Sequence, residues 1–168
     1  MRGKIIKKKG SMYYFKIEDF EHSEDAERLG IDNRIKDNEV RNNIIVLVEE
    51  LLDKVQDMYE KPISISSGYR CSALNSAIGK SRTSQHCKGE AADLSVEAGE
   101  EGLRKIVAII LNNALQFDQL VWEEKDGGYG LHVSYRRTQP NRNLCMIYDG
   151  TEYTIYTPEF FYSIICDK

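Results

Sequence analysis

The residues of this chain with the most definite chemistry are His86 and Asp93, which lie in the run SQHCKGEAAD (residues 84–93), and the distant His132. Imidazole and carboxylate groups are zinc ligands, and ligand atoms about 2 Å from a tetrahedral zinc ion lie roughly 3 Å from one another. A continuous helix would separate His86 from Asp93 by about 10 Å, so the chain must fold back between them. Gly89 permits such a reversal. The alternative is a polar surface loop with an incidental histidine.

Three further segments accompany this run: SGYR (residues 67–70), VWE (residues 121–123) and HVSY (residues 132–135). In this order and spacing the four segments resemble the zinc D-Ala-D-Ala carboxypeptidase family, most closely the short branch common among phage lysins and gut-bacterial proteins. The resemblance runs from about Tyr13 to Tyr135. It implies a hedgehog/DD-peptidase-like fold and a substrate in the peptide part of bacterial peptidoglycan. Members of this family cut bonds next to D-amino acids, as D,D-carboxypeptidases, dipeptidases or cross-bridge endopeptidases.

The resemblance implies one Zn²⁺ ion held by His86, Asp93 and His132. Three protein ligands leave the fourth position for water, which is the arrangement of a catalytic zinc site. The ion lowers the pKa of that water and polarises the scissile carbonyl. Two of the three histidines of the chain fall in these motifs, which supports the assignment. Cys87 is the alternative fourth ligand, and a site closed by its thiol would be purely structural.

A general base must also take a proton from the water and pass it to the leaving amine. Better-known members of the family place an acid three residues before the second histidine, where this chain has Tyr129. In the branch that the chain resembles most, the glutamate of VWE is the natural candidate, which is Glu123 here. A non-catalytic binding module on the same fold, as in hedgehog signalling domains, is therefore the alternative function.

The geometry of a β-hairpin tests the choice of Glu123. A two-residue turn at 127–128 puts Glu123 directly opposite His132, and a turn at 126–127 shifts the pairing by two but keeps both side chains on one face. A three-residue loop would put Glu124 on that face instead, because a shift of one residue reverses every side chain. We therefore expect Glu123 to be the base.

Other polar and aromatic residues of the motifs have expected roles at the substrate. Arg70, as in the family, is expected to bind a substrate carbonyl or carboxylate and to stabilise charge on the oxygen. Ser84 and Gln85 are expected to bind the substrate backbone, or else to orient His86 from behind. Trp122 is expected in the core, since aromatic side chains on hairpin strands more often pack there.

Elements of two kinds must position these residues. Apolar residues recur at three- and four-residue spacing over 38–61 and 99–115, which predicts two long amphipathic helices, and a shorter helix is expected over 71–78. Strands are expected at 63–65, 93–96, 117–123, 131–136, 144–148 and 153–156, and a final helix capped by Thr157 begins at Pro158. Helices first and hairpins later indicate an α+β domain whose small, mainly antiparallel sheet is flanked by helices.

Composition bounds the remaining possibilities. The chain has 168 residues, of which 41% are hydrophobic and 30% charged, as in an ordinary globular protein. We expect a disordered basic tail over 1–11 and a single zinc peptidase domain over 12–168, acting as a monomer. Five basic residues lie in that tail, so the formal net charge of −4 leaves about −9 on the rest, which disfavours nucleic-acid binding. No run is apolar enough for a membrane span or a signal peptide. We expect synthesis in the cytoplasm and action on the cell wall after release, as in a phage or prophage lysin.

Overall fold

The N-terminal helices follow the periodic spacing of apolar residues, except at one wider, π-helical turn. The computed structural model describes residues 12–125 and 127–167. The chain begins with α1 (Ile17–Glu21), α2 (Glu24–Leu29), α3 (Asn38–Leu47), the π-helical turn η1 (Val48–Leu52) and α4 (Asp53–Tyr59). The single helix predicted over 38–61 therefore contains a wider turn. Ile44, Val48 and Leu52 are buried at four-residue spacing. Such a repeat drifts around an α-helix of 3.6 residues per turn, and the wider turn keeps these side chains on the core face.

The remaining elements include every predicted strand and helix, with ends that differ by up to three residues from the predicted ones, and one short 3-10 helix in addition. They are β1 (Ile63–Ser67), α5 (Ser72–Ala77), the 3-10 helix η2 (Gln85–Lys88), β2 (Ala91–Val96), α6 (Gly99–Asn112), β3 (Gln119–Lys125), β4 (Gly128–Ser134), β5 (Leu144–Tyr148), β6 (Tyr153–Tyr156) and α7 (Pro158–Cys166). The hydroxyl of Thr157 accepts the backbone N–H of Phe160 and caps α7, as expected.

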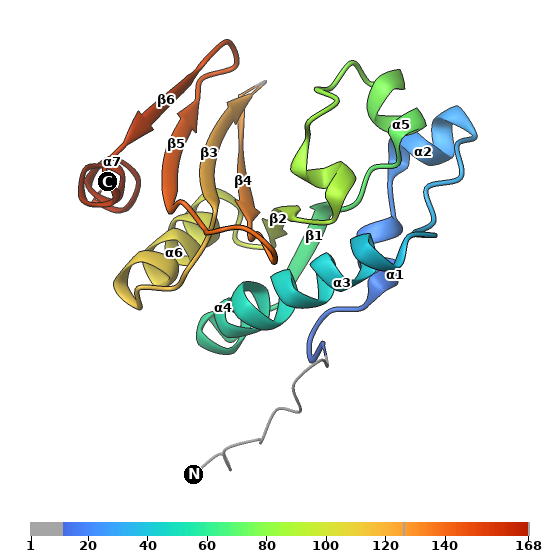
Figure 1. Cartoon of the computed structure of the whole chain (residues 1–168). Coiled ribbons are helices and arrows are strands. Elements are labelled where there is room, and N and C mark those ends of the chain that lie inside the picture. Colours follow the sequence, from blue (N-terminus) through green and yellow to red (C-terminus); the bar gives the residue numbers. More distant parts are fainter. Residues whose placement is uncertain (1–11, 126, 168) are drawn as a thin grey trace.

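The strands form one six-stranded sheet in the order β1-β2-β4-β3-β5-β6 (Figure 1). Every neighbouring pair is antiparallel except β3 and β5, which run parallel. The prediction of an α+β fold with a mainly antiparallel sheet and flanking helices is confirmed. Two sequence-distant segments, β2 and β4, are direct neighbours in this order, and they carry Asp93 and His132.

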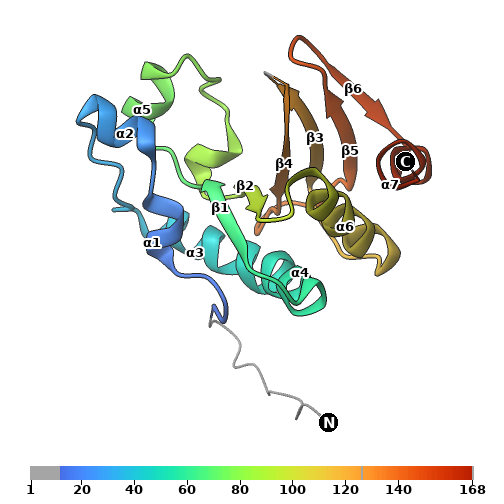
Figure 2. The ribbon, with the colours of Figure 1, turned by 180° about the vertical axis from the view of Figure 1, so that it is seen from behind.

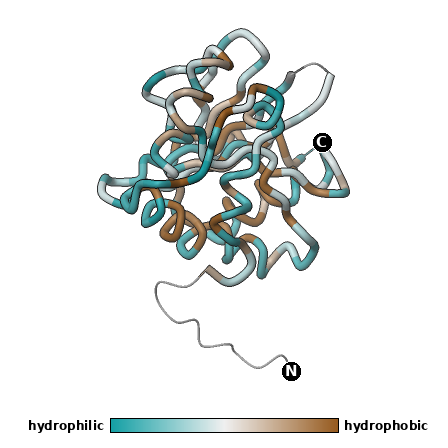
Figure 3. Tube along the Cα trace, turned by 90° about the vertical axis from the view of Figure 1, so that its right-hand side faces the viewer, coloured by the Kyte–Doolittle hydropathy of each residue, from teal (hydrophilic) through white to brown (hydrophobic). Residues whose placement is uncertain are grey.

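The two faces of the sheet carry different sets of side chains, because successive side chains of a strand point to opposite faces. On one face Leu94, Trp122 and Leu131 are buried against the helical layer, where α6 contacts β2 and β4 and α7 contacts β5. The core position predicted for Trp122 is correct. Figures 1 and 2 show α6 and α7 on this side of the sheet and the segment with α5 and η2 on the other. In Figure 3 the brown, apolar stretches follow the inner helices and strands, and teal marks the outer loops.

Two further expectations concern the ends of the chain and the membrane. The basic tail predicted over 1–11 lies outside the described residues. Within the residues that are described, no helix has the length and apolar character needed to cross a bilayer.

Candidate metal centre and active-site cleft

The loop before β2 carries His86, and local hydrogen bonds shape it. The Ser84 hydroxyl accepts the backbone N–H of His86 and begins η2. Gly89 ends η2 with a φ of +69°, a left-handed conformation that glycine adopts without strain. A Cβ atom at Gly89 would also lie 2.6 Å from the carbonyl oxygen of Val40 in α3, so a larger residue would force α3 or the loop to move. The chain thus folds back onto β2, as the spacing of His86 and Asp93 requires.

Strand pairing brings the second and third candidate ligands together. Asp93 of β2 lies directly opposite His132 of β4, so their side chains share a face. The Asp93 Oδ1 atom is 2.9 Å from His132 Nδ1 and 3.3 Å from His86 Nε2, and the two ring nitrogens are 3.2 Å apart. Ligand atoms about 2.0–2.1 Å from a tetrahedral ion are separated by roughly 3.3 Å. The three residues therefore form a group that could hold a metal ion.

Contacts behind the group orient His86. The residue is 3% exposed, and Nδ1 lies 2.6 Å from the Gly68 carbonyl oxygen. A carbonyl oxygen only accepts, so Nδ1 donates its proton to Gly68 and Nε2 is the ring atom directed at Asp93. Gly68 is fixed in turn, because Tyr69 donates its N–H to the Phe20 carbonyl oxygen at 2.8 Å. This role of the Gly68 carbonyl could not be predicted from the sequence, where the SGYR segment was the only signal.

The electrostatics of the group favour the protonation states that a metal ion needs. Burial lowers the pKa of His86 and so keeps its imidazole neutral. Burial by itself would raise the pKa of Asp93, but the neighbouring His86 and His132 outweigh it and hold this pKa well below its usual range. A neutral imidazole and an ionised carboxylate are the ligand forms of these side chains.

The β3–β4 hairpin places Glu123 on the face of the metal group. Val121 is the residue opposite His132, and Glu123 pairs with Gly130, so the direct opposition of Glu123 and His132 is not observed. The register is the one shifted by two residues, which preserves the shared face. The Glu123 side chain lies over Gly130, where a Cβ atom would be in ordinary contact with Glu123 Oε2 at 3.5 Å.

The neighbouring hairpin residues lie elsewhere. Glu124 pairs with Tyr129, one position out of phase with Glu123, and is exposed. The Tyr129 ring lies 5.3 Å from the Trp122 ring, on the side away from His132. The position at which better-known family members carry an acid therefore does not face the metal group in this chain.

The metal group lies in a cleft of about 890 Å³. His86, Asp93, His132 and Glu123 line it, together with Arg70, Ser84 and Gln85, so the structure gathers every predicted site residue in one place. The backbone N–H of Arg70 donates to the His86 carbonyl oxygen at 3.3 Å. The Nε atom of the Arg70 side chain is buried and has no hydrogen-bond partner among the described residues.

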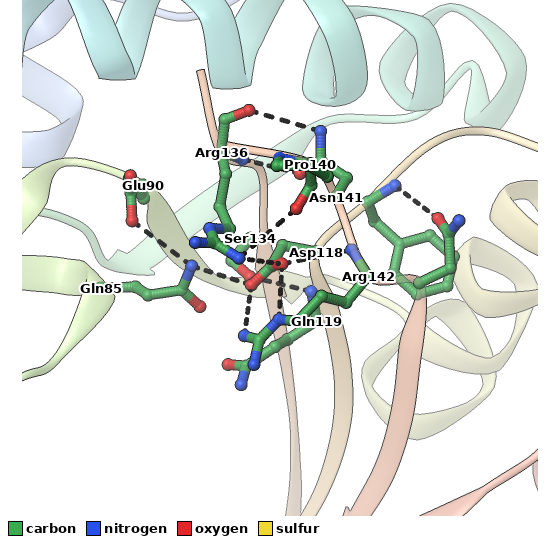
Figure 4. A network of polar contacts seen from close by, with 11 residues as sticks. Gln85, Glu90, Asp118, Gln119, Ser134, Arg136, Pro140, Asn141 and Arg142 are labelled. Atoms are coloured by element: carbon green, nitrogen blue, oxygen red, sulfur yellow. Dashed lines mark hydrogen bonds and ion pairs between the residues drawn. The ribbon is translucent and has the colours of Figure 1, made fainter. Parts of the chain in front are cut away.

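The side-chain amide of Gln85 donates hydrogen bonds to two carboxylates of the protein. Its Nε2 lies 3.0 Å from Asp118 Oδ2 and 3.4 Å from Glu90 Oε2 (Figure 4). Both partners are carboxylates, which accept, so the amide nitrogen must be the atom directed at them. Neither acid belongs to the metal group, so the expected role of Gln85 in orienting His86 stays a prediction. The expected contact with substrate stays a prediction.

Two aromatic residues of the cleft were not anticipated from the sequence. Tyr148 of β5 and Tyr153 of β6 line the cleft, and their rings stack with centroids 4.6 Å apart. They share a cross-strand row with Glu123. Their only signal in the sequence was their place on either side of the predicted turn at Asp149. Cys87, the alternative fourth ligand, is a free, half-buried thiol and is not part of the metal group among the described residues.

Comparison with known proteins extends these observations. A family model described as Peptidase M15 matches residues 13–126. The matched range contains Arg70, His86, Asp93 and Glu123 and ends before His132, which the pairing of β2 and β4 brings to the same place. No curated protein matches the sequence.

Proposed function

Because the chain belongs to peptidase family M15, whose members are zinc metallopeptidases that act on peptidoglycan-type substrates, we propose that it hydrolyses peptide bonds next to D-amino acids in bacterial peptidoglycan. The proposed activity is that of a D,D-carboxypeptidase or a cross-bridge endopeptidase. The observation that carries it is the convergence of His86, Asp93 and His132 within 4.8 Å in a cleft.

In this proposal the three residues hold one Zn²⁺ ion. The distances among their ligand atoms, the Gly68 carbonyl behind His86 and the ionised state of Asp93 all fit such an ion. Three protein ligands leave an open position, as catalytic zinc sites require. When bound, zinc would lower the pKa of a water molecule and polarise the scissile carbonyl.

Glu123 is the proposed general base. Its carboxylate shares a face with His132 and lines the same cleft. There it would accept the proton of the attacking water and deliver it to the leaving amine, so that one side chain serves as base and then as acid. Glu124 is out of phase on the same strand and belongs to the other face, which supports the choice of Glu123 over Glu124.

Arg70 is the proposed substrate-binding and charge-stabilising residue. It lines the cleft beside the metal group, and a guanidinium can donate two parallel hydrogen bonds to a carbonyl or carboxylate. Charge that develops on the carbonyl oxygen during attack would strengthen these bonds, which is how such a donor accelerates the reaction. Ser84 and Gln85 would complete the wall behind His86.

The decisive experiment compares Glu123→Gln with the matched control Glu124→Gln. Purified, zinc-loaded proteins are incubated with defined muropeptides, and the products are identified by mass spectrometry, which also names the bond that is cut. We expect Glu123→Gln to lose at least about 100-fold in rate while keeping one equivalent of zinc, and Glu124→Gln to stay near wild type. Equal activity of the two variants would contradict the assignment of the base.

The alternative is a zinc-containing module that binds cell wall or protein without turnover. The observation that favours it is Tyr129, which stands where better-known members carry an acid and faces away from His132. A wild-type protein that holds zinc and retains muropeptides but leaves them intact would establish this alternative.

We also propose that the protein works as a phage or prophage lysin, which a turbidity assay on bacterial cell walls tests directly.

A further inference from the structure

A second polar cluster lies beside the metal group and has no role in the proposed reaction. It is centred on Asp118, which is 0% exposed. Arg142 donates to Asp118 through Nε at 2.8 Å and Nη2 at 2.6 Å, and Arg136 Nη1 forms an ion pair with it at 3.6 Å. Gln85 joins from the loop of His86 (Figure 4). The cluster thus ties together segments that precede β2, β3 and β5 and one that follows β4.

The cluster is layered, with acids beneath and cations at the surface. Asp118 is fully buried and Glu90 is 8% exposed, whereas the side chains of Arg136 and Arg142 are 25% and 45% exposed and line the cleft. Burial alone would raise the pKa of Asp118, but the hydrogen bonds and charge of Arg142 outweigh it and lower this pKa, so the carboxylate stays ionised. A buried carboxylate therefore fixes two guanidinium groups at the cleft wall before any substrate binds.

Each guanidinium keeps a donor edge for a ligand. Arg142 uses Nε and Nη2 for Asp118, and Arg136 uses Nη1 for Asp118 and for the Pro140 carbonyl oxygen. Among the described residues no partner occurs for Nη1 of Arg142 or Nη2 of Arg136. Paired, pre-oriented guanidinium edges at a solvent-facing wall are the geometry that proteins use to bind carboxylates.

The register gives the position of Asp118, and so of the guanidinium groups bound to it, relative to the metal group. Val121 lies opposite His132, and Asp118 precedes Val121 by three residues. At a strand rise of about 3.3 Å per residue, Asp118 is roughly 10 Å from the His132 row along the cleft. An extended substrate peptide covers about 7–10 Å in two to three residues, and the length of an acidic side chain spans the rest. The terminal carboxylate of a carboxypeptidase substrate, one residue from the scissile bond, would be too close.

We propose that Arg136 and Arg142 form a carboxylate-binding subsite for an acidic group of the peptide two to three residues from the bond that is cleaved. The inference rests on the proposed function and narrows its substrate class to acidic peptides that extend beyond a terminal dipeptide. Arg136 and Arg142 are then specificity-determining residues, and Asp118 is a positioning residue that acts through them.

The test combines an amidated substrate with an arginine variant. Two synthetic stem peptides share the cleaved bond and carry, two or three residues away, either a carboxylate or its amide. Their affinities for zinc-loaded Glu123→Gln protein are measured by calorimetry, and kcat/KM is measured with the wild type. We expect amidation to weaken binding about 10- to 100-fold in the wild-type subsite and the acid–amide ratio to approach one in Arg142→Gln and Arg136→Gln.

The outcomes separate this inference from the proposed function. Equal affinity for acid and amide, or a ratio that both arginine variants leave unchanged, would overturn the subsite even if both peptides are cleaved. Absence of cleavage by the zinc-loaded wild type would overturn the hydrolase proposal, while the calorimetric ratio would still decide the subsite. Should Arg142→Gln fail to fold because it leaves Asp118 buried without its partner, Arg136→Gln and the two peptides suffice.

Discussion

Gly89 links the local turn of the metal loop to the helix behind it, so Gly89→Ala is a sharp perturbation of the site. Two independent costs meet at this residue. Its φ of +69° lies in the left-handed region, where alanine is strained, and the added Cβ would lie 2.6 Å from Val40 O and 2.9 Å from Ile44 Cγ1. The first contact is with backbone, so helix α3 or the loop itself must move.

The magnitude follows from these two costs. Left-handed backbone costs about 1–2 kcal/mol for a residue with a Cβ atom, and a lower entropy of the unfolded chain returns about 0.5–1 kcal/mol. Overpacking of a close contact adds about 1–3 kcal/mol. We expect Gly89→Ala to lower the free energy of unfolding by about 2–4 kcal/mol, and the melting temperature by about 5–15 °C for a chain of this size.

Gly79 offers a matched control. Its φ is +67°, and a Cβ atom built there meets nothing within 4 Å, so Gly79→Ala carries the backbone cost without the clash. Urea unfolding of both variants, with and without zinc, isolates the clash as the difference between them, which we expect to be about 1–3 kcal/mol. Because the N–H of Gly89 bonds to the His86 carbonyl oxygen, zinc affinity should also fall about tenfold in Gly89→Ala and stay unchanged in Gly79→Ala.

Two results would refute this reasoning. If Gly89→Ala and Gly79→Ala are equally stable, the approach of α3 to the loop does not constrain residue 89. If Gly89→Ala is destabilised but binds zinc as the wild type does, the turn does not position His86, and the alignment of the metal group must depend on the sheet alone.

Three further perturbations test other parts of the structure. When free zinc is held at 100 times its Kd for the protein, removing the zinc with a chelator should lower the free energy of unfolding by about 2.7 kcal/mol. This corresponds to a fall of about 5–10 °C in Tm by differential scanning fluorimetry. His132→Ala should show no such response. Asp118 has a lowered folded-state pKa, so its contribution is present above the unfolded value of about 4 and is lost as pH falls through the folded value. Asp118→Asn should therefore lower the free energy of unfolding, measured with urea, by about 3–5 kcal/mol at pH 7. The difference in stability between this variant and the wild type should shrink below about pH 4. A difference that does not change with pH would show that Asp118 is not ionised in the folded protein. Tyr153→Ala removes a ring that lines the cleft, so KM for muropeptides should rise about tenfold while zinc content is unchanged, and unaltered kinetics would show that Tyr153 does not contact substrate.

Much of the metal loop could be predicted from its sequence because its causes are local. His86 and Asp93 can approach only if the chain reverses, and Gly89 is the residue between them that reverses it. The alternation of strand side chains likewise put Glu123 on the face of His132 for either two-residue turn, and the structure keeps that face although the register differs by two. Predictions of this kind depend on a few neighbouring residues and on backbone sterics.

The Asp118 cluster could not be predicted in the same way. No motif contains Asp118, Arg136 or Arg142, and the sequence around each one is typical of a charged residue exposed to solvent. They meet because β3 pairs with β4 on one side and with β5 on the other, which brings the segments before β3 and β5 together. The role of the Gly68 carbonyl was hidden for a similar reason, since backbone atoms carry no sequence signature.

The sequence by itself determined the chemistry available to this protein, namely two imidazoles and a carboxylate in loops and strands whose local geometry follows from glycine placement and period-two alternation. Only the tertiary structure decided that β2 lies beside β4, which sets Asp93 opposite His132, and that buried Asp118 holds two arginines at the cleft wall. The physical reason is range. Turns and strand faces depend on neighbouring residues, whereas strand order and buried ion pairs depend on packing of the whole core, to which distant segments contribute together.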